Sequence, residues 1–285
     1  MSIQPAALSG AHMETPTLAD TAAVLTDLLA FERVGEGPDS VVLKHPNTPW
    51  RLTLHDGGTN AATKFAGNHY GVRVVNKGEI DAAHTYLNVH AEEYGLRAVR
   101  EPENQHGSYS VYFTEPGTNV LEIECYEDVN RKAAGVERLG GVRAPHWDHL
   151  MPSERFPGRG YVPQALTHGT LSVADSAVSC RFYTEVLGLE AHNAYGEGRI
   201  TYIKHPDTRH YIVCAKRPEL LVNPLSFRYT LTVGSADELE AAHRWISEHQ
   251  AEYAINEVRD IVAGGDTNSF LVRDPDMNWW EIAAR

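Results

Sequence analysis

Residues 81–94 read DAAHTYLNVHAEEY, and residues 240–253 read EAAHRWISEHQAEY. His84, His90 and Tyr94 of the first segment each recur in the second segment, 159 residues later. A match of several residue types at one fixed spacing indicates an internal duplication, which decides the fold before any single element is considered.

The flanking sequence repeats at a spacing of 159 or 160 residues. LKHPNTP at 43–49 corresponds to IKHPDTR at 203–209, and EPGTNVLEIE at 115–124 corresponds to DPDMNWWEIA at 274–283. Because these matches extend over most of the chain, the duplicated unit is a whole domain rather than a short motif.

The chain therefore divides into two homologous modules. We place the first module at residues 1–128 and the second at 164–285, joined by a linker at 129–163 that is rich in Gly, Pro and Arg.

Each module divides again into two similar units. Leu166–Val173 reads as a strand, and a helix is expected at 175–187, capped by Asp175 or Ser176 and ended by Gly188. Short strand patterns follow, and the cycle then restarts. The predicted fold is α+β, with four βαβββ units at about 8–57, 66–128, 164–216 and 224–285.

Composition limits the function. The net charge of −13 argues against a general nucleic-acid binder. No run of 18 apolar residues predicts a membrane span, and no secretory signal is visible at the N-terminus. Three cysteines without a CxxC pair fit a reducing compartment, so we expect a cytoplasmic protein.

The organisation resembles the vicinal oxygen chelate superfamily, which includes glyoxalase I, bleomycin-resistance proteins and extradiol ring-cleaving dioxygenases. The resemblance is carried by THGTLSVADSAVSCRFYTEVLGLE at 167–190, NHYGVRVV at 68–75 and the two closing hairpins. It implies that the units pair into cupped mixed sheets around a metal site. The implied ligands are one His from the first strand of each paired unit and a Glu from a last strand.

The resemblance places two of these ligands in the second unit, at His69 and Glu122. In the fourth unit the corresponding residues are Arg228 and Glu281. An arginine cannot ligate a metal, so we expect that this copy is inactive and that Arg228 and Glu281 form a buried ion pair. Glu124 shares a strand face with Glu122, but the Asn-x-x-Glu spacing favours Glu122.

Two assignments remain open for the third ligand. In the first, His168 from unit three completes the site, which pairs unit two with unit three and unit one with unit four. An ungapped alignment puts Met13 at the corresponding position of unit one. In the rival assignment a one-residue bulge brings in His12, units one and two pair, and His55 becomes the acid/base.

Two further residues are candidates for catalysis. If the hairpin turns at Gly117, Tyr112 faces Glu122 across the strand ladder, and Leu271 takes its place in the fourth unit. Ring-cleaving dioxygenases that resemble this pattern place an active-site Tyr ten residues before the ligand Glu. They also carry an acid/base His followed by a hydrophobic pair, which His210 in RHYIV matches.

The resemblance implies a reaction. A reduced metal, Fe(II) or alternatively Mn(II), would support extradiol cleavage of a catechol-type aromatic by O2. The expected partners are a small aromatic diol, O2 and further copies of the chain. The alternatives are a glyoxalase-type isomerase or lyase, a hydroquinone-cleaving enzyme, and a non-enzymatic ligand-binding module. The linker motif at 146–149, HWDH, is expected to pack or to line the pocket mouth.

Overall fold

The computed structural model describes most of the chain, namely residues 3–58, 68–105, 107–126, 141–195, 198–218, 220, 222–264 and 267–285. Contacts group the chain into two compact bodies. The first body is Glu14–Thr170, and the second combines Met1–Met13 with Leu171–Arg285.

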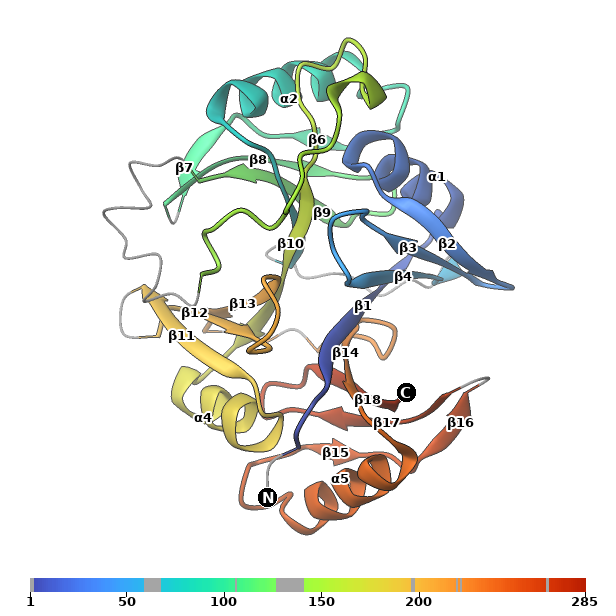
Figure 1. Cartoon of the computed structure of the whole chain (residues 1–285), viewed down its shortest axis with the longest axis vertical. Helices are drawn as coiled ribbons and strands as arrows, with labels where there is room; N and C mark the ends of the chain where they lie inside the picture. Colours follow the sequence, from blue (N-terminus) through green and yellow to red (C-terminus); the bar gives the residue numbers. More distant parts are fainter. Residues whose placement is uncertain are drawn as a thin grey trace. The chain divides into compact units, whose positions relative to one another are not determined.

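The elements follow the predicted order of strand, helix and strands, four times over (Figure 1). Units one and two comprise β1 (Ala7–Thr15), α1 (Leu18–Ala23), β2 (Glu32–Gly37), β3 (Ser40–Lys44), β4 (Arg51–Asp56), β5 (His69–Arg73), α2 (Lys77–Val89), β6 (Ala98–Val99), β7 (Glu103–Gln105), β8 (Ser108–Thr114) and β9 (Val120–Cys125). Units three and four comprise β10 (Ala165–Val173), α4 (Ser176–Arg181), β11 (Glu190–Tyr195), β12 (Ile200–Lys204), β13 (Tyr211–Lys216), β14 (Arg228–Val233), α5 (Ala236–Glu248), β15 (Glu257–Val258), β16 (Val262–Gly264), β17 (Thr267–Arg273) and β18 (Trp279–Ala284).

The α+β class is confirmed, because the described strands fall into two mixed sheets of nine strands each. Units two and four depart slightly from the predicted pattern. Each carries one additional short strand, β7 or β16, which pairs with the long strand of the closing hairpin. A short 3-10 turn at Ser153–Arg155 lies in the segment between the modules.

The first strands of the units pair across the sequence modules. In the first body β10 runs antiparallel to β5, which joins unit three to unit two. In the second body β1 runs antiparallel to β14, which joins unit one to unit four. This is the unit pairing expected from the first ligand assignment. Because the opening strand of each module joins the other module, the bodies do not coincide with the predicted modules.

The helices begin where the sequence predicts. The Asp175 side chain accepts hydrogen bonds from the backbone amides of Ala177 and Val178, which caps α4. Gly188 has a φ of 68°, a left-handed conformation that ends the helical segment. One detail differs from the expected regular helix. After Arg181 the chain continues as a π-helical turn at Phe182–Val186. Unit one has the same feature at Val24–Leu28.

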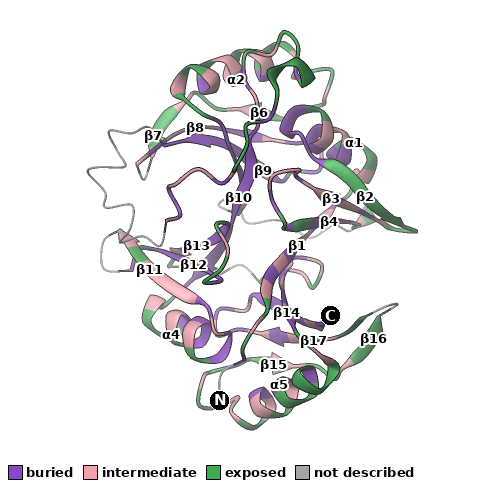
Figure 2. Ribbon diagram, viewed as in Figure 1, coloured by how far each residue is buried: buried purple, intermediate pink, exposed green. Residues whose placement is uncertain are grey.

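The core lies between the helices and the strands that they cover. In the first body α2 packs against β8 and β9 through Ile80, Ala83 and Leu87. Figure 2 shows β8 and β10 as largely buried, whereas the outer surface of α2 is exposed. No helix among the described residues is long and apolar enough to cross a membrane.

A buried carboxylate fixes the closing hairpin of unit two. Glu115 is fully buried and accepts hydrogen bonds from the amides of Gly117 and Asn119, each at 2.7 Å. It also accepts a hydrogen bond from the Thr21 hydroxyl in α1, so one side chain ties the hairpin turn to the preceding unit. In unit four Asp274 has the same function, accepting from Tyr183 and from the amide of Asn278.

We expect Glu115→Gln to lower the free energy of unfolding by about 1–3 kcal/mol. Every partner described here donates to Glu115, so the amide nitrogen of Gln would face a donor and leave a buried group unsatisfied. Urea denaturation would measure the change. The control is Glu92→Gln, at an exposed position, and an equal change in both variants would contradict the prediction.

Candidate metal centre

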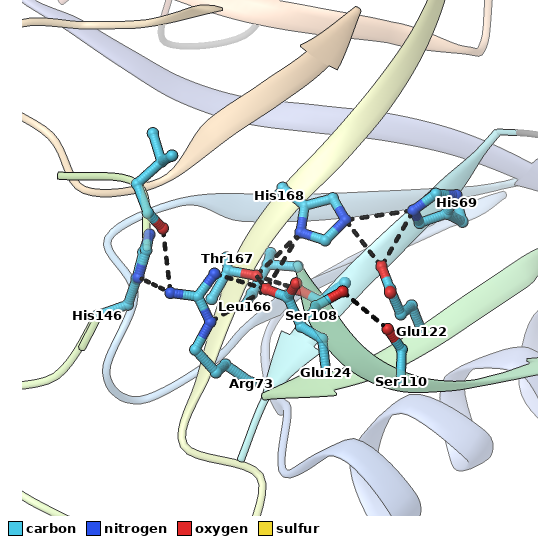
Figure 3. A network of polar contacts seen from close by, with 12 residues as sticks. His69, Arg73, Ser108, Ser110, Glu122, Glu124, His146, Leu166, Thr167 and His168 are labelled. Carbon is cyan, nitrogen blue, oxygen red and sulfur yellow. Dashed lines mark hydrogen bonds and ion pairs between the residues drawn. The ribbon is translucent and has the colours of Figure 1, made fainter. Parts of the chain in front are cut away.

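Three adjacent strands of the first body bring the candidate ligands together. The middle strand, β5, begins at His69 and runs parallel to β9, with Gly71 opposite Glu122. On its other edge β5 runs antiparallel to β10, with Gly71 opposite His168. Because both neighbours are aligned on the same residue of β5, Glu122 and His168 flank the strand at one level (Figure 3).

The three ligand atoms form a nearly regular triangle. His69 Nε2 lies 3.2 Å from His168 Nε2 and 3.2 Å from Glu122 Oε2, and His168 Nε2 lies 3.1 Å from the same oxygen. These residues form the one group with metal-binding geometry among the described residues. Figure 3 shows the two rings and the carboxylate pointing toward one another.

The donor set fits a divalent metal. With bonds of ~2.1 Å, two ligands at right angles around one ion lie ~3.0 Å apart, and two tetrahedral ligands lie ~3.4 Å apart. The observed separations of 3.1–3.2 Å lie between these values. Two imidazoles and one carboxylate on a single face are the donor set of non-haem Fe(II) oxygenases, and they leave the opposite face open.

The pKa values of two of these buried ligands, Glu122 and His168, are shifted from their usual values. Burial acts to raise the pKa of Glu122, but hydrogen bonds from His168 and His69 outweigh it and hold the pKa well below its usual range. Burial acts to lower the pKa of His168, but the charge of Glu124 and the hydrogen bond to Glu122 raise it to about 9. A metal would replace the positive charge of the protonated imidazole and release its proton.

Glycine at position 71 makes room for His168. A Cβ on Gly71 would overlap the His168 ring, so no larger residue fits at this point of β5 without moving the ring. Glycine within a strand typically marks such a close approach.

A β-bulge in β10 sets the direction of His168. The strand register shifts between Leu166 and His168, which leaves Thr167 as the additional residue. Side chains normally alternate across a strand, but a bulge interrupts this alternation and can re-aim a side chain. Here Thr167 and His168 contact each other, with 3.0 Å between Oγ1 and Nδ1.

Tyr112 lies where the sequence predicts, directly opposite Glu122 in the β8–β9 ladder. Its ring packs edge-on against His69, with 5.3 Å between the ring centroids. Burial, followed by the charge of Glu122, raises the pKa of Tyr112 well above its usual value. The phenol therefore keeps its proton and can act only as a neutral hydrogen-bond donor or acceptor.

The corresponding place in the second body holds an ion-pair cluster. Arg228 Nε lies 3.2 Å from Glu281 Oε2, as expected, and His12 Nε2 contacts the same oxygen at 3.2 Å. The Thr230 hydroxyl donates to that oxygen at 3.1 Å. Burial opposes ionisation of Glu281, yet His12 and Arg228 together hold its pKa far below the usual range.

The strand register corrects the alignment of unit one. Thr230 lies opposite Glu281, as Gly71 lies opposite Glu122, and its partner on β1 is Gly10. Gly10, not Met13, therefore occupies the position that corresponds to His168. The error is three residues, because the alignment was anchored on Asp20, whereas the residue of unit one that corresponds to the helix N-cap Asp175 is Thr17.

The rival third ligand, His12, contacts Glu281 and Thr230 in the second body. The geometry therefore favours His168. His55 lies in β4 opposite Ser40, and it is not in the group with metal-binding geometry.

The predicted acid/base residue, His210, makes a hydrogen bond to the backbone. His210 lies in the second body, just before β13, and its Nε2 donates to the Leu8 carbonyl at 2.8 Å. Burial lowers the pKa of His210 to about 4, despite the hydrogen bond to Leu8. The acid/base function of this residue stays a prediction.

Sequence reasoning did not identify Gly71, Thr167 or Arg73 as parts of the site. Glycine inside the apolar run of NHYGVRVV was a usable sign of a close approach. The bulge at Thr167 left no sign in the sequence. Arg73 Nη2 lies 2.6 Å from Glu124 Oε1. This ion pair engages the carboxylate that was the alternative to Glu122 as a ligand.

We expect Gly71→Ala to abolish metal binding while the protein still folds. The added methyl group would displace the His168 ring from the triangle. Metal content after dialysis and elemental analysis would measure the effect, with circular dichroism to establish folding. Gly35→Ala is the matched control, because a Cβ there meets only ordinary contacts from Val42. Full metal content in Gly71→Ala would contradict the spatial argument.

We expect His210→Gln to make the free energy of unfolding fall less between pH 7 and pH 5. As pH falls below 6.5, the unfolded chain protonates this ring while the folded chain, with a pKa of about 4, does not. The wild-type protein should therefore lose roughly 2 kcal/mol more than the variant between pH 7 and pH 5. Urea denaturation at both pH values, with His84→Gln as control, measures this difference. An unchanged pH dependence would contradict it.

Comparisons with known proteins agree with this architecture. Residues 165–282 match the family model "Glyoxalase/Bleomycin resistance protein/Dioxygenase superfamily". No curated protein matches the sequence.

Two solved structures have the same fold along nearly the whole chain. A structure of glyoxalase I from Zea mays is 13% identical, with a TM-score of 0.66, and the match covers 97% of this chain and 91% of that one. A putative dioxygenase from Bacillus subtilis is 12% identical, with a TM-score of 0.63, and the match covers 99% of this chain and 86% of that one. Residues 165–282 are thus similar to this superfamily, and the chain as a whole has the fold of these two structures.

Proposed function

We propose that this protein is a non-haem metal-dependent dioxygenase that opens a catechol-type aromatic ring by extradiol cleavage. The observation that carries the proposal is the triangle of His69 Nε2, His168 Nε2 and Glu122 Oε2, with sides of 3.1–3.2 Å. Two neutral imidazoles and one carboxylate hold Fe(II), or alternatively Mn(II), and leave adjacent positions open.

Each residue of the site has a defined task in this proposal. A divalent metal held by His69, His168 and Glu122 would bring a diol and O2 together and would favour the ionised form of the diol. Glu122 contributes the single negative charge among the ligands. Tyr112 keeps its proton and donates a hydrogen bond to a substrate oxygen beside His69, with which its ring is in contact.

The acid/base step is assigned to His210 by the resemblance alone. In the structure its Nε2 hydrogen bonds to the Leu8 carbonyl, so proton transfer through that nitrogen would require the bond to break. The activity of His210→Gln therefore tests this assignment separately from the metal triad.

The cellular setting belongs to the proposal as well. Cys180 and Cys214 are free thiols, which supports a reducing, cytoplasmic location. The proposed partners are a small aromatic diol, O2 and further copies of the chain. The net charge of −13 supports the absence of nucleic acid from this set.

The test is the iron content of anaerobically purified protein, together with O2 uptake on a panel of catechols and hydroquinones. The wild-type protein should hold about one iron per chain and consume O2 with formation of a yellow ring-opened product. His69→Ala and His168→Ala should lose the iron and lower the rate by more than ~100-fold, because even residues behind the ligands typically contribute ~10–100-fold.

His12→Ala is the matched control, since it removes the rival ligand by the same substitution. It should keep its iron and its activity. Loss of iron in His12→Ala with full retention in His168→Ala would reverse the ligand assignment. A wild-type protein that holds metal but consumes no O2, and that has glyoxalase activity instead, would replace the proposed reaction. A wild-type protein that contains no metal would instead support the alternative of a non-enzymatic ligand-binding module.

A further inference from the structure

A chain of polar groups contacts Nδ1 of His168, the ring nitrogen that is not in the proposed ligand triangle. His168 Nδ1 lies 3.0 Å from the Thr167 hydroxyl, which lies 2.9 Å from Glu124 Oε1. The direct separation between His168 Nδ1 and Glu124 Oε1 is 3.5 Å, too long for a good hydrogen bond. The hydroxyl of Thr167 therefore bridges the ring and the carboxylate.

The direction of the hydrogen bonds follows from the charge at one end. Arg73 donates to Glu124 Oε1 from Nη2 at 2.6 Å and from Nε at 3.1 Å, so this buried carboxylate is ionised and accepts only. Thr167 has a single hydroxyl hydrogen, and its possible acceptors are Glu124 Oε1 at 2.9 Å and the Gly71 carbonyl at 3.0 Å, of which the charged carboxylate is the stronger acceptor. When it donates that hydrogen to Glu124, its oxygen can accept the hydrogen of His168 Nδ1.

Arg73 is itself held in place by the segment between the modules. Its Nη1 donates to the carbonyls of Val142 at 3.1 Å and Ala144 at 2.8 Å. The same nitrogen contacts His146 Nδ1 at 2.9 Å (Figure 3). All of these residues belong to the first body. The predicted packing function of the HWDH motif thus takes a specific form, in which His146 contacts the charge that balances Glu124.

We propose that Thr167, Glu124 and Arg73 form a positioning relay that keeps hydrogen on Nδ1 of His168 and leaves the Nε2 lone pair for the metal. This inference rests on the proposed metal centre and concerns residues that do not touch the metal. Groups that hydrogen-bond the far nitrogen of a ligating imidazole fix its tautomer and its orientation. The β-bulge at Thr167 allows the relay, because it brings the hydroxyl beside the ring of the next residue.

The test is the affinity for Mn(II), measured by electron paramagnetic resonance, which reports the free ion directly. Thr167→Val keeps the side-chain shape and removes the hydroxyl, and we expect it to weaken Mn(II) binding by ~10–100-fold. Thr167→Ser restores a hydroxyl and should bind within about threefold of the wild-type protein. Glu124→Gln, which removes the charge, should weaken binding as Thr167→Val does.

Thr232→Val is the matched control, because it removes a half-buried strand hydroxyl in the second body, where Thr232 donates to Ser9. The thermal midpoint of the metal-free protein separates a loss of stability from a loss of positioning. Equal Mn(II) affinity in Thr167→Val and the wild type would overturn the relay alone. Equal weakening in Thr167→Val and Thr167→Ser would also overturn it. A wild-type protein that binds no Mn(II) and no iron would overturn both the relay and the metal centre.

Discussion

The pairing of β10 with β5 is the constraint on which the site depends. It aligns His168 with Gly71, and the parallel pairing of β5 with β9 aligns Glu122 with the same glycine. The three ligand atoms therefore lie close together because the β5–β10 and β5–β9 ladders both align on Gly71. A slip of one residue in either ladder would send a ligand to the opposite face of the sheet.

The second body shows what the same register produces with different side chains. Thr230 occupies the place of Gly71, Arg228 that of His69, and Gly10 that of His168. Only the carboxylate of Glu281 is retained, and it is neutralised by Arg228 and His12. The second body thus has side chains of other types at two of the three positions. Where Gly71 leaves space for an imidazole ring, Thr230 places a side chain that holds the carboxylate by a hydrogen bond.

Much of this arrangement could be predicted from the sequence, and the reasons are physical. The duplication revealed four units, and the symmetry of the hairpin around Gly117 correctly placed Tyr112 opposite Glu122. Strand pairing between distant segments could be inferred only by comparing which copies retained functional side chains. The bulge at Thr167 was not predictable, because bulges depend on the partner strand and not on local propensity. The ungapped alignment to Met13 failed because it paired Asp175 with Asp20, a residue inside α1, when the N-cap of that helix is Thr17.

The exchange of first strands has a consequence for how the protein matures. His168 lies 99 residues after His69 in the chain, so their contact is strongly non-local. Such contacts form late in folding, because a long loop must close before they add stability. During synthesis the first module emerges with two of the three proposed ligands, and the third follows only when the opening strand of the second module has left the ribosome. If the site holds a redox-active metal, as proposed, incomplete chains cannot bind that metal through all three ligands.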